Sequence, residues 1–470
     1  MSRYLFVLGS NFRLSIAELD HLLKYSRYKG RIIDYSANIA VVEFEELEEE
    51  GHYINDLQEI QYMLGGCLKI AKIYDFVNIS TIKKAFPVNI KKFSLVKKSR
   101  KRILKILDNI LTGKREKIFP KVYGNFFFAV SIYPNFFDDE YYKEILVKHL
   151  LPFLNKKITK QLKKKGAEKA IYFKYPMKNI KSGNLNPIFP HHVIQYELFK
   201  PNRADIVFGF TEEGVYIGRT FTTDNPNFKK KLDEERPSKD FKSSIPPKLA
   251  KIMLNFLNLY HARHTYKILD PFVGNGTILM FALMQDFKVY GSDIDEEKVQ
   301  NTIKNLHWLV NEIELEEKPD FSRLVKNIGI NHLSEKFEAE YFDGICTEPS
   351  LGPYYREKPY YPQAEKLREE KLRPLYKATF QEAETLLKPE SRIVVTAPII
   401  HTIDGGELQL SIRKIAEKRG FVQIPLLDEM RLVNKSNRRL QFNESHYHSM
   451  IDAKADQVIS RKIFIFEKGK

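Results

Sequence analysis

Two glycines stand between a short apolar stretch and the start of a helical pattern, a spacing that suits a ligand-binding turn. Residues 267–270 have the composition of a buried strand, Gly274 and Gly276 follow, and the helical pattern begins at Ile278. Glycines at a strand-to-helix turn let the backbone approach a ligand and leave the first amides of the helix exposed. A second strand pattern ends at Asp293, about 20 residues further on, where a carboxylate accepts hydrogen bonds from both ribose hydroxyls. This spacing predicts a nucleoside site at the carboxyl ends of parallel strands.

The composition of this turn distinguishes between nucleoside ligands. A dinucleotide site carries three glycines as Gly-x-Gly-x-x-Gly, whereas Leu279 stands at the third position here. The turn also opens with Asp270, and a carboxylate suits a cationic ligand better than a pyrophosphate. The run Asp270-Pro-Phe-Val-Gly-Asn-Gly-Thr277 resembles the first motif of methyltransferases that act on exocyclic amino groups of nucleobases. The alternative is a glycine turn that binds no ligand.

A second candidate turn follows the strand pattern at residues 341–346 and carries the catalytic candidates Glu348, Pro349, Ser350 and Leu351. Amino-methyltransferases have Asp or Asn, then Pro, then Pro or another residue, then an aromatic residue at such a strand end. An exocyclic amine is a poor nucleophile because its lone pair is delocalised into the ring. Oxygen acceptors turn that lone pair toward the methyl group, an aromatic ring stacks on the base, and alignment of the reacting atoms supplies most of the remaining rate.

The turn departs from this pattern at three positions. Glu348 replaces Asp or Asn on a longer arm, Ser350 is not proline, and Leu351 is not aromatic, so that Tyr354 or Tyr355 would have to supply the stacking. A plain strand-end turn, or a decayed catalytic motif, is the alternative interpretation.

The net charge of +16 and the pI near 9.3 suggest a polyanionic partner, because each cation set against a phosphate releases counterions. Two clusters concentrate this charge, one at residues 97–102 and one at residues 156–165, where several lysines fall at helical spacing. Solvated helix faces are the alternative interpretation. The RNA-binding candidates are Lys97, Lys98, Arg100, Arg102, Lys156, Lys160, Lys163 and Lys164.

The periodicity predicts four parts. Residues 1–80 read as a small α+β unit, in which a helix begins at Ser15 with Glu18 at the capping-box position. Residues 81–223 form a second α/β module, residues 224–245 a charged linker without periodicity, and residues 246–470 a doubly wound, mostly parallel sheet. The last strand pattern, at residues 461–466, follows a long connection and is expected to be an inserted antiparallel strand.

Other classes of protein are disfavoured by composition. Cys67 and Cys346 are far apart and have no metal-ligand spacing, so neither a disulfide framework nor a metal site is expected, which is typical of a reducing cytoplasm. The apolar runs are too short to span a bilayer, and the run at residues 5–8 is too short for a signal peptide.

With these motifs in view, the chain resembles the THUMP-domain RNA methyltransferases, and in particular the tRNA guanine-N2 methyltransferases. The resemblance rests on residues 270–277, Gly291-Ser-Asp293, Asn305-Leu-His-Trp308, the Glu348-Pro turn and the stretch from Arg236-Pro237 to Asn255. Softer matches occur at residues 4–9, 14–18, 64–69 and 203–219. The resemblance implies a Rossmann-like S-adenosylmethionine methyltransferase domain, preceded by a ferredoxin-like α+β domain and a THUMP-type α/β domain.

The resemblance also implies roles for individual residues. Asp270 would lie near the methionine amino group, Gly274 and Gly276 near the methionyl–ribose part, and Asp293 on the ribose. Asn331 is the candidate for the adenine contact. The remaining cofactor candidates are Phe272, Thr277 and Ile294. Residues 236–255 would form one wall of the cofactor pocket.

The partner implied by the family is tRNA, gripped at its acceptor end by the THUMP and lead-in domains, with a guanine-10-like base as the methyl acceptor. A small activating subunit, a monomer and a homodimer all stay open. Two rival functions also stay open: a DNA amino-methyltransferase, and a tRNA-binding protein that keeps the cofactor fold without turnover.

Overall fold

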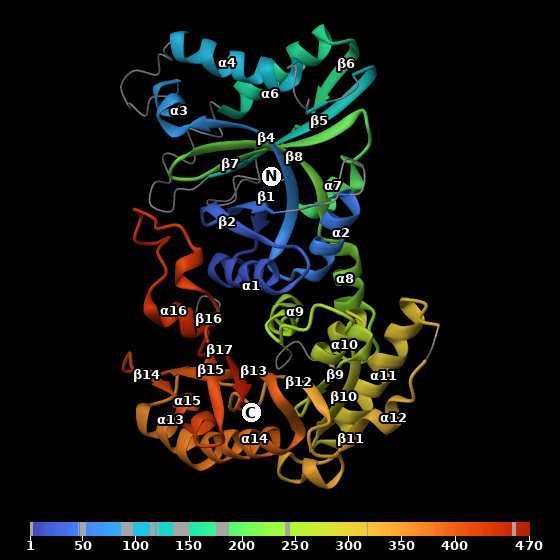
Figure 1. Cartoon of the computed structure of the whole chain (residues 1–470), viewed down its shortest axis with the longest axis vertical. Coiled ribbons are helices and arrows are strands. Elements are labelled where there is room, and N and C mark those ends of the chain that lie inside the picture. The colour runs from blue at the N-terminus through green and yellow to red at the C-terminus, as the bar shows by residue number, and fades with distance from the viewer. Residues whose placement is uncertain are drawn as a thin grey trace.

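The computed structural model describes residues 3–45, 47, 53–85, 97–112, 118–119, 122–134, 150–174, 188–239, 245–316, 318–453 and 457–470. These residues form two β-sheets, one of eight strands and one of nine. The two sheets lie toward opposite ends of the long axis, with helices between and around them (Figure 1). Within the described residues, no helix is long and apolar enough to cross a membrane.

The amino-terminal half of the eight-stranded sheet follows a βαββαβ order. Its four strands lie in the order β2-β3-β1-β4, which is a ferredoxin-like arrangement. The predicted ferredoxin-like unit is therefore confirmed in its topology, although strand β2 had no counterpart in the sequence pattern. The elements are β1 (Arg3–Leu8), α1 (Phe12–Tyr25), β2 (Gly30–Tyr35), β3 (Ile39–Phe44), α2 (Tyr53–Met63) and β4 (Cys67–Asn78).

The second half of this sheet continues directly from β4, which pairs with β1 on one side and with β8 on the other. The boundary expected near residue 80 therefore crosses one continuous sheet, because backbone pairing joins the two units. The predicted hairpin at Glu213–Gly214 joins β7 to β8. The elements are α3 (Ile79–Ala85), α4 (Lys97–Thr112), β5 (Gly124–Tyr133), α6 (Leu151–Lys164), β6 (Ala167–Tyr172), α7 (Pro190–Gln195), β7 (Arg203–Phe210) and β8 (Gly214–Thr223). Residues 138–149 of the helix expected at 138–165 lie outside the described residues.

The start of α1 corrects one prediction. The helix begins at Phe12, and Asn11 caps it by accepting a hydrogen bond from the Leu14 amide. Ser15 therefore lies inside the helix, and Glu18 is not a capping-box residue. The buried Glu18 carboxylate accepts hydrogen bonds from the amides of Gly65 and Gly66 at 2.7 and 2.8 Å, so it holds the turn between α2 and β4.

The nine-stranded sheet has the main order β11-β10-β9-β12-β13-β17-β15. The first five strands in this order, from β11 through β10, β9 and β12 to β13, are mutually parallel. Strand β17 is antiparallel to both of its neighbours, β13 and β15. This is a Rossmann-like sheet with an inserted antiparallel strand, as the sequence pattern predicted. The strands are β9 (Lys267–Asp270), β10 (Lys288–Asp293), β11 (Val325–Asn327), β12 (Phe342–Thr347), β13 (Leu387–His401), β14 (Glu407–Gln409), β15 (Phe421–Ile424), β16 (Met450–Asp452) and β17 (Ile459–Lys468).

Helices flank this sheet on both faces (Figure 1). The α-helices are α9 (Pro247–Asn255), α10 (Thr277–Met284), α11 (Glu296–Glu312), α12 (Phe321–Leu324), α13 (Tyr361–Leu367), α14 (Arg373–Leu386), α15 (Ile412–Glu417) and α16 (Glu444–His448). Helices α9, α10 and α11 lie in one core cluster, and α14 and α15 lie in another. Short helical turns are η3 (Arg263–Thr265), η4 (Ile330–Glu335), η5 (Arg368–Leu372) and η6 (Glu429–Arg431).

The segment expected to be a linker is part of the fold. It contains α8 (Pro226–Glu234), which Asn225 caps by accepting hydrogen bonds from the amides of Asn227 and Phe228. Beyond α8, the Arg236 side chain is buried. The prediction of an irregular linker at residues 224–245 is therefore corrected, because a capped helix and a buried cation occupy much of it.

A shared core joins the two sheets. Helix α1 packs against α9, and one apolar cluster runs from α1 and α2 into α9, α10 and the carboxyl-terminal sheet. The Asn255 amide crosses this junction and donates to Glu18 at 2.7 Å and to the Met63 carbonyl at 2.8 Å. The junction thus combines apolar burial with buried hydrogen bonds from the Asn255 amide nitrogen, whereas the Asn255 Oδ1 is buried without a partner among the described residues.

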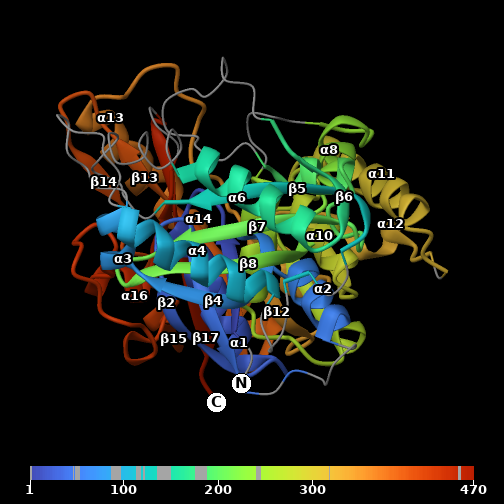
Figure 2. The same cartoon turned by 90° about the horizontal axis from the view of Figure 1, so that it is seen from above.

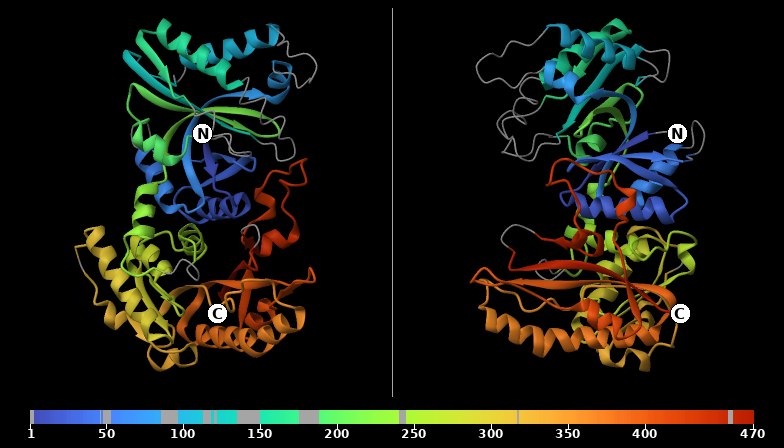
Figure 3. Two further views of the ribbon diagram at one scale, coloured as in Figure 1. Left: turned by 180° about the vertical axis from the view of Figure 1, so that it is seen from behind. Right: turned by 60° about the vertical axis from the view of Figure 1, so that its left-hand side comes forward.

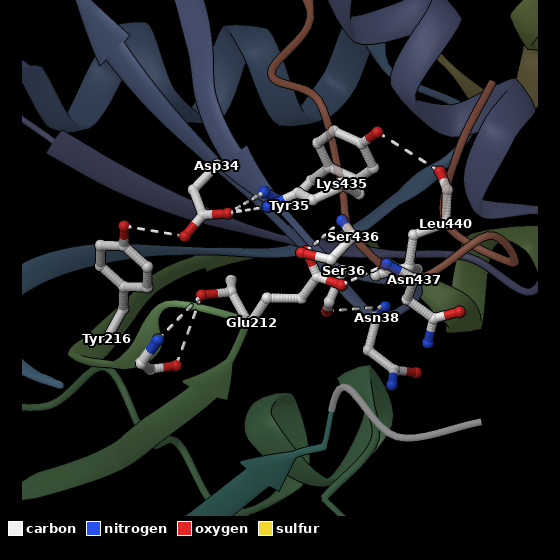
Figure 4. A network of polar contacts seen from close by, with 12 residues as sticks. Asp34, Tyr35, Ser36, Asn38, Glu212, Tyr216, Lys435, Ser436, Asn437 and Leu440 are labelled. Atoms are coloured by element: carbon white, nitrogen blue, oxygen red, sulfur yellow. Dashed lines mark hydrogen bonds and ion pairs between the residues drawn. The ribbon is translucent and has the colours of Figure 1, made fainter. Parts of the chain in front are cut away.

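Residues 425–449, which we call the arm, connect β15 to β16 and reach back to the amino-terminal unit (Figure 3). In Figure 4, Lys435 of the arm points at Asp34 in β2, and Glu212 accepts hydrogen bonds from the amides of Ser436 and Asn437 at 3.0 and 2.7 Å. Lys435 and Asp34 form a buried ion pair. The sequence pattern did not reveal this contact, because its partners lie about 400 residues apart.

Candidate functional site

Asp270 lies at the carboxyl end of β9 and is fully buried. Its Oδ1 accepts a hydrogen bond from the Phe272 amide at 3.1 Å and another from the Thr347 hydroxyl at 2.7 Å. Burial raises the pKa of Asp270 to about 7, and the negative charges of Asp293 and Glu348 add to this effect. A cation placed beside this carboxylate would favour its ionised form.

The glycine turn has the backbone conformation that its sequence predicts. Gly274 and Gly276 have φ values of +50° and +79°, in the region that favours glycine. A Cβ at Gly276 would lie 2.8 Å from the Thr302 side chain, whereas a Cβ at Gly274 would meet no atom within 4 Å. Thr302 also donates to the Gly274 carbonyl at 2.7 Å. The turn is therefore packed against α11 on one side and open above Gly274.

Asp293 ends β10 beside this turn. Its Oδ2 accepts from the Gly274 amide at 3.0 Å, and its Oδ1 accepts from the Asp295 amide at 3.1 Å. Because each carboxylate oxygen has two lone pairs, both oxygens can accept one further hydrogen bond. Ile294, which follows, is 81% exposed. The structure thus brings Asp293 and Gly274 together, as the spacing predicted.

The proposed adenine contact, Asn331, lies on η4 with an exposed side chain. Sequence reasoning missed Asn327, which ends β11. The Asn327 amide donates to the carbonyls of Asp293 and Ile294, both at 3.1 Å, and so joins the ends of β10 and β11. The contact of Asn331 with adenine stays a prediction.

Glu348 is engaged by another side chain. Arg461 on β17 donates to it from Nε at 2.7 Å and from Nη2 at 3.1 Å, and Thr396 donates at 3.3 Å. Both charged side chains are only 11% exposed. Burial raises the pKa of Glu348, while the Arg461 pairing opposes that rise. Since a carboxylate has about four lone-pair sites, roughly one is left for a substrate N–H.

The other candidate residues of this turn differ in their exposure to solvent. Pro349 is buried, Leu351 is half-buried, and Ser350 is exposed with its hydroxyl accepting from the Gly352 amide at 3.4 Å. Tyr354 is 71% exposed. An aromatic ring is therefore accessible near the turn, although not at position 351.

The segment from Arg236 to Ser238 lies against the glycine turn. Arg236 donates to the Thr277 hydroxyl at 3.2 Å. Ser238 exchanges hydrogen bonds with the Asn305 amide, which also donates to the Asn275 carbonyl at 2.9 Å. These contacts place Arg236 and Ser238 against the turn, and the expectation that residues 236–255 form a wall of the cofactor pocket stays a prediction. The sequence pattern did not indicate Thr347 as a site residue. Asn305, in contrast, lies in the run 305–308 on which the family resemblance rests.

The two basic clusters lie at the far end of the molecule from the glycine turn, on α4 and α6 (Figure 1). Seen from above, these two helices lie over the amino-terminal sheet, and they pack against one another (Figure 2). On α6, Leu154, Ile158 and Leu162 are buried, whereas Lys156, Lys160, Lys163 and Lys164 are exposed. Helix α4 carries Lys97, Lys98, Arg100 and Arg102, whose side chains lie outside the described part of the structure.

The fold and the site define the class of protein as an α/β protein with a Rossmann-like domain and a candidate ligand site at the edge of its sheet. The carboxyl-terminal domain is a Rossmann-like α/β domain, in which a glycine turn and two strand-end carboxylates, Asp270 and Asp293, meet at the carboxyl edge of the sheet. In open α/β sheets this edge is where ligands bind.

Comparisons with known proteins find relatives that align with part of this chain. No family model matches the chain. It is 33% identical over 109 residues to the tRNA (guanine(10)-N2)-dimethyltransferase of Pyrococcus abyssi, which is 23% of this chain and 29% of the relative. It is also 33% identical over 128 residues to the enzyme of the same name from Methanothermobacter thermautotrophicus, which is 26% of this chain and 33% of the relative. These matches span about a third of either relative.

A solved structure, that of TrmN from Thermus thermophilus, aligns with all of this chain at 14% identity and a TM-score of 0.48.

Proposed function

We propose that this chain is an S-adenosylmethionine-dependent methyltransferase that acts on the exocyclic N2 amine of a guanine in tRNA, at a guanine-10-like site. The observation that carries the proposal is that two carboxylates, Asp270 and Asp293, both accept hydrogen bonds from backbone amides of the glycine turn. The names of the aligned relatives support tRNA rather than DNA as the substrate.

The residues of the turn fit the proposed cofactor. The Oδ1 atom of Asn275 is buried and, among the described residues, has no hydrogen-bond partner, so a polar ligand there would satisfy it. The space above Gly274 is open to a ligand. Asp270 is a buried acid whose charge a ligand cation would stabilise, and Asp293 has lone pairs left for two ribose hydroxyls.

In the proposed reaction, S-adenosylmethionine supplies a methyl group carried on a positively charged sulfur. Asp270 would hold the cationic methionine end, and Asp293 would orient the ribose. The remaining lone pair of Glu348 would accept an N–H of the guanine amine. When the new N–C bond forms, the bond between the methyl carbon and the sulfur breaks, the sulfur becomes neutral, and the amine proton passes to solvent. Because Arg461 and Thr396 fix Glu348, its main contribution would be to orient the amine.

The exposed lysines of α6 support a large anionic substrate. They face solvent at the end of the molecule far from the site, so a substrate that reached both would have to be extended. A tRNA meets this requirement, and its phosphates would lie on Lys156, Lys160, Lys163 and Lys164.

One observation favours a second candidate, a tRNA-binding protein that binds cofactor without turnover. The hydrogen bonds from Arg461 and Thr396 together occupy about three of the four Glu348 acceptor sites, which an active acceptor residue would need. Under this alternative, the protein would bind both ligands and transfer no methyl group.

The deciding experiment incubates full-length protein with pooled unmodified tRNA and methyl-labelled S-adenosylmethionine, and then maps methylated nucleosides by mass spectrometry. Labelled N2-methylguanosine or N2,N2-dimethylguanosine is the expected product. Binding of both ligands without label transfer would establish the second candidate. Label confined to adenine or cytosine would overturn the assignment of the target base. The Asp293→Ala variant is the control, since it should transfer no label.

A further inference from the structure

A cavity of about 700 Å³ lies at the carboxyl edge of the nine-stranded sheet, beside the Glu348 turn. Its walls come from the loop after that turn, the end of β13, β16 and the start of β17. The residues used below are Arg356, Lys358, Ile399, His401, Ile451 and Ser460. Neither Asp270 nor Asp293 is among its described lining residues, so this cavity is distinct from the proposed cofactor site.

The register of β17 relates the cavity to the Glu348 pair through two consecutive strand residues that point to opposite faces of the sheet. Arg461 points to Glu348, whereas the preceding residue, Ser460, pairs with Ile399 and lies on the other face of the strand. Side chains of successive strand residues point to opposite faces. A ligand in the cavity would therefore lie one residue along β17 from the Glu348–Arg461 pair, on the other face of the sheet.

A fixed polar group stands in the cavity wall. His401 Nδ1 lies 3.3 Å from a carboxylate oxygen of Glu407, and its Nε2 lies 2.9 Å from the Ser460 hydroxyl. In the neutral imidazole with its N–H on Nδ1, that N–H faces the Glu407 carboxylate and Nε2 accepts from Ser460. Ser460 is almost completely buried, and its oxygen then has lone pairs free to accept an N–H from a ligand.

Two cations line the cavity, and exposed aromatic rings stand close to them in the sequence. Arg356 and Lys358 are exposed, and no ion pair engages them within the described residues. Tyr354 and Tyr360 flank them in sequence and are 71% and 62% exposed. Ile399 and Ile451 add apolar lining. Aromatic faces beside unpaired cations are what single-stranded nucleic acid requires, because rings stack on bases and cations hold phosphates.

We propose that this cavity binds one unpaired nucleotide of the RNA substrate, at the same edge of the sheet as the base that is methylated. Arg356 and Lys358 contact its phosphate, Tyr354 or Tyr360 stacks on its base, and Ser460 accepts an N–H from the base edge. An acidic peptide would use only the two cations, whereas a nucleotide uses the rings and Ser460 as well. The inference rests on the proposed function, since it presupposes an RNA substrate.

The first test measures binding of fluorescein-labelled unmodified tRNA by anisotropy, with full-length protein, at several salt concentrations. The double variant Arg356→Ala/Lys358→Ala should bind about tenfold more weakly, with a salt slope lower by about one. The matched control Arg413→Ala/Lys414→Ala removes two exposed cations from α15 and should change binding less than about twofold. Equal binding and slope in wild type and the first double variant would overturn the proposal.

The second test locates the nucleotide by crosslinking 4-thiouridine-substituted tRNA and identifying the linked peptides by mass spectrometry. Crosslinks should fall within residues 354–361 or 458–461, and Tyr354→Leu/Tyr360→Leu should weaken tRNA binding about tenfold or more. Crosslinks found only elsewhere, in a protein that methylates tRNA, would overturn this inference and leave the proposed function standing. A protein that binds no tRNA would overturn both. Displacement of tRNA from the cavity by polyglutamate at equal charge concentration would assign it to an acidic peptide instead.

Discussion

Arg461 donates two hydrogen bonds to Glu348, from Nε at 2.7 Å and from Nη2 at 3.1 Å, across 113 residues of sequence. This bidentate pair puts a positive charge beside the residue expected to receive the substrate amine. It limits the freedom of the Glu348 carboxylate and compensates its charge where water is largely excluded. The chemistry of the strand-end turn therefore depends on β17 as much as on the turn itself.

Removal of Arg461 should leave the Glu348 carboxylate buried and unpaired. We expect Arg461→Met to lower the free energy of unfolding by about 3–5 kcal/mol, as measured by urea denaturation. The double variant Glu348→Gln/Arg461→Met should recover much of this loss, because no unpaired charge remains. Independent, additive effects of the two substitutions would show that the pair does not exist in solution.

The raised pKa of Asp270 predicts a pH dependence of cofactor binding. Only ionised Asp270 attracts a cation, and its pKa in the free protein is about 7. Affinity for S-adenosylmethionine should therefore increase about tenfold between pH 6 and pH 8, as measured by calorimetry. Asp270→Asn should bind weakly with no such dependence, and a wild-type affinity that stays flat over this range would contradict the assignment.

The same pKa predicts an effect on stability with the opposite trend. Unfolded Asp270 releases its proton near pH 4, whereas the folded protein keeps it until about pH 7. The folded state thus binds more protons between these values, and this residue's contribution to stability falls as pH rises through that window. Asp270→Asn should therefore unfold at higher urea concentration than wild type at pH 8, and should gain little at pH 4.

Asp293 is predicted to control affinity for the ribose. Loss of two charge-assisted hydrogen bonds, each contributing about 1.5–3 kcal/mol, should weaken S-adenosylmethionine binding in Asp293→Ala by more than about 100-fold. Asp293→Asn should lose less, since an amide oxygen still accepts. Unchanged calorimetric affinity in the alanine variant would remove Asp293 from the site.

The exposed lysines of α6 are predicted to bind phosphates. Lys163→Glu/Lys164→Glu should weaken tRNA binding and lower the dependence of the logarithm of affinity on the logarithm of salt by about two. The control Lys414→Glu/Lys418→Glu places the same charge change on and just after α15. An unchanged salt dependence would return the α6 lysines to an ordinary solvated surface.

The arm is predicted to depend on its buried ion pair. Lys435→Met should leave Asp34 without its partner and lower the free energy of unfolding by about 3–5 kcal/mol. Faster amide hydrogen exchange in residues 425–449 should accompany this loss. The control Asp34→Asn/Lys435→Met should restore part of the protection, because the Tyr216 hydroxyl, which donates to Asp34 in the native protein, can still donate to the amide oxygen that replaces the carboxylate.

Sequence patterns predicted local features well. The strand that ends at Asp270, the glycine turn and the spacing to Asp293 depend on neighbouring residues and on glycine backbone freedom, and the structure has all three. A prediction from local spacing was wrong where the residue's hydrogen-bond partners lie far away in the sequence. Glu18 has capping-box spacing, yet it binds Gly65, Gly66 and Asn255, because Asn11 already caps the helix and burial favours the distant donors.

The sequence by itself determined the Rossmann-like domain, its antiparallel last strand and the acidic glycine turn, since hydrophobic period and turn composition act over a few residues. Only the tertiary structure decided what Glu348 touches, how the arm holds the amino-terminal sheet, and that two expected units share that sheet. These outcomes join residues tens to hundreds of positions apart. Such pairings depend on how whole elements pack, and no local pattern of residues encodes them.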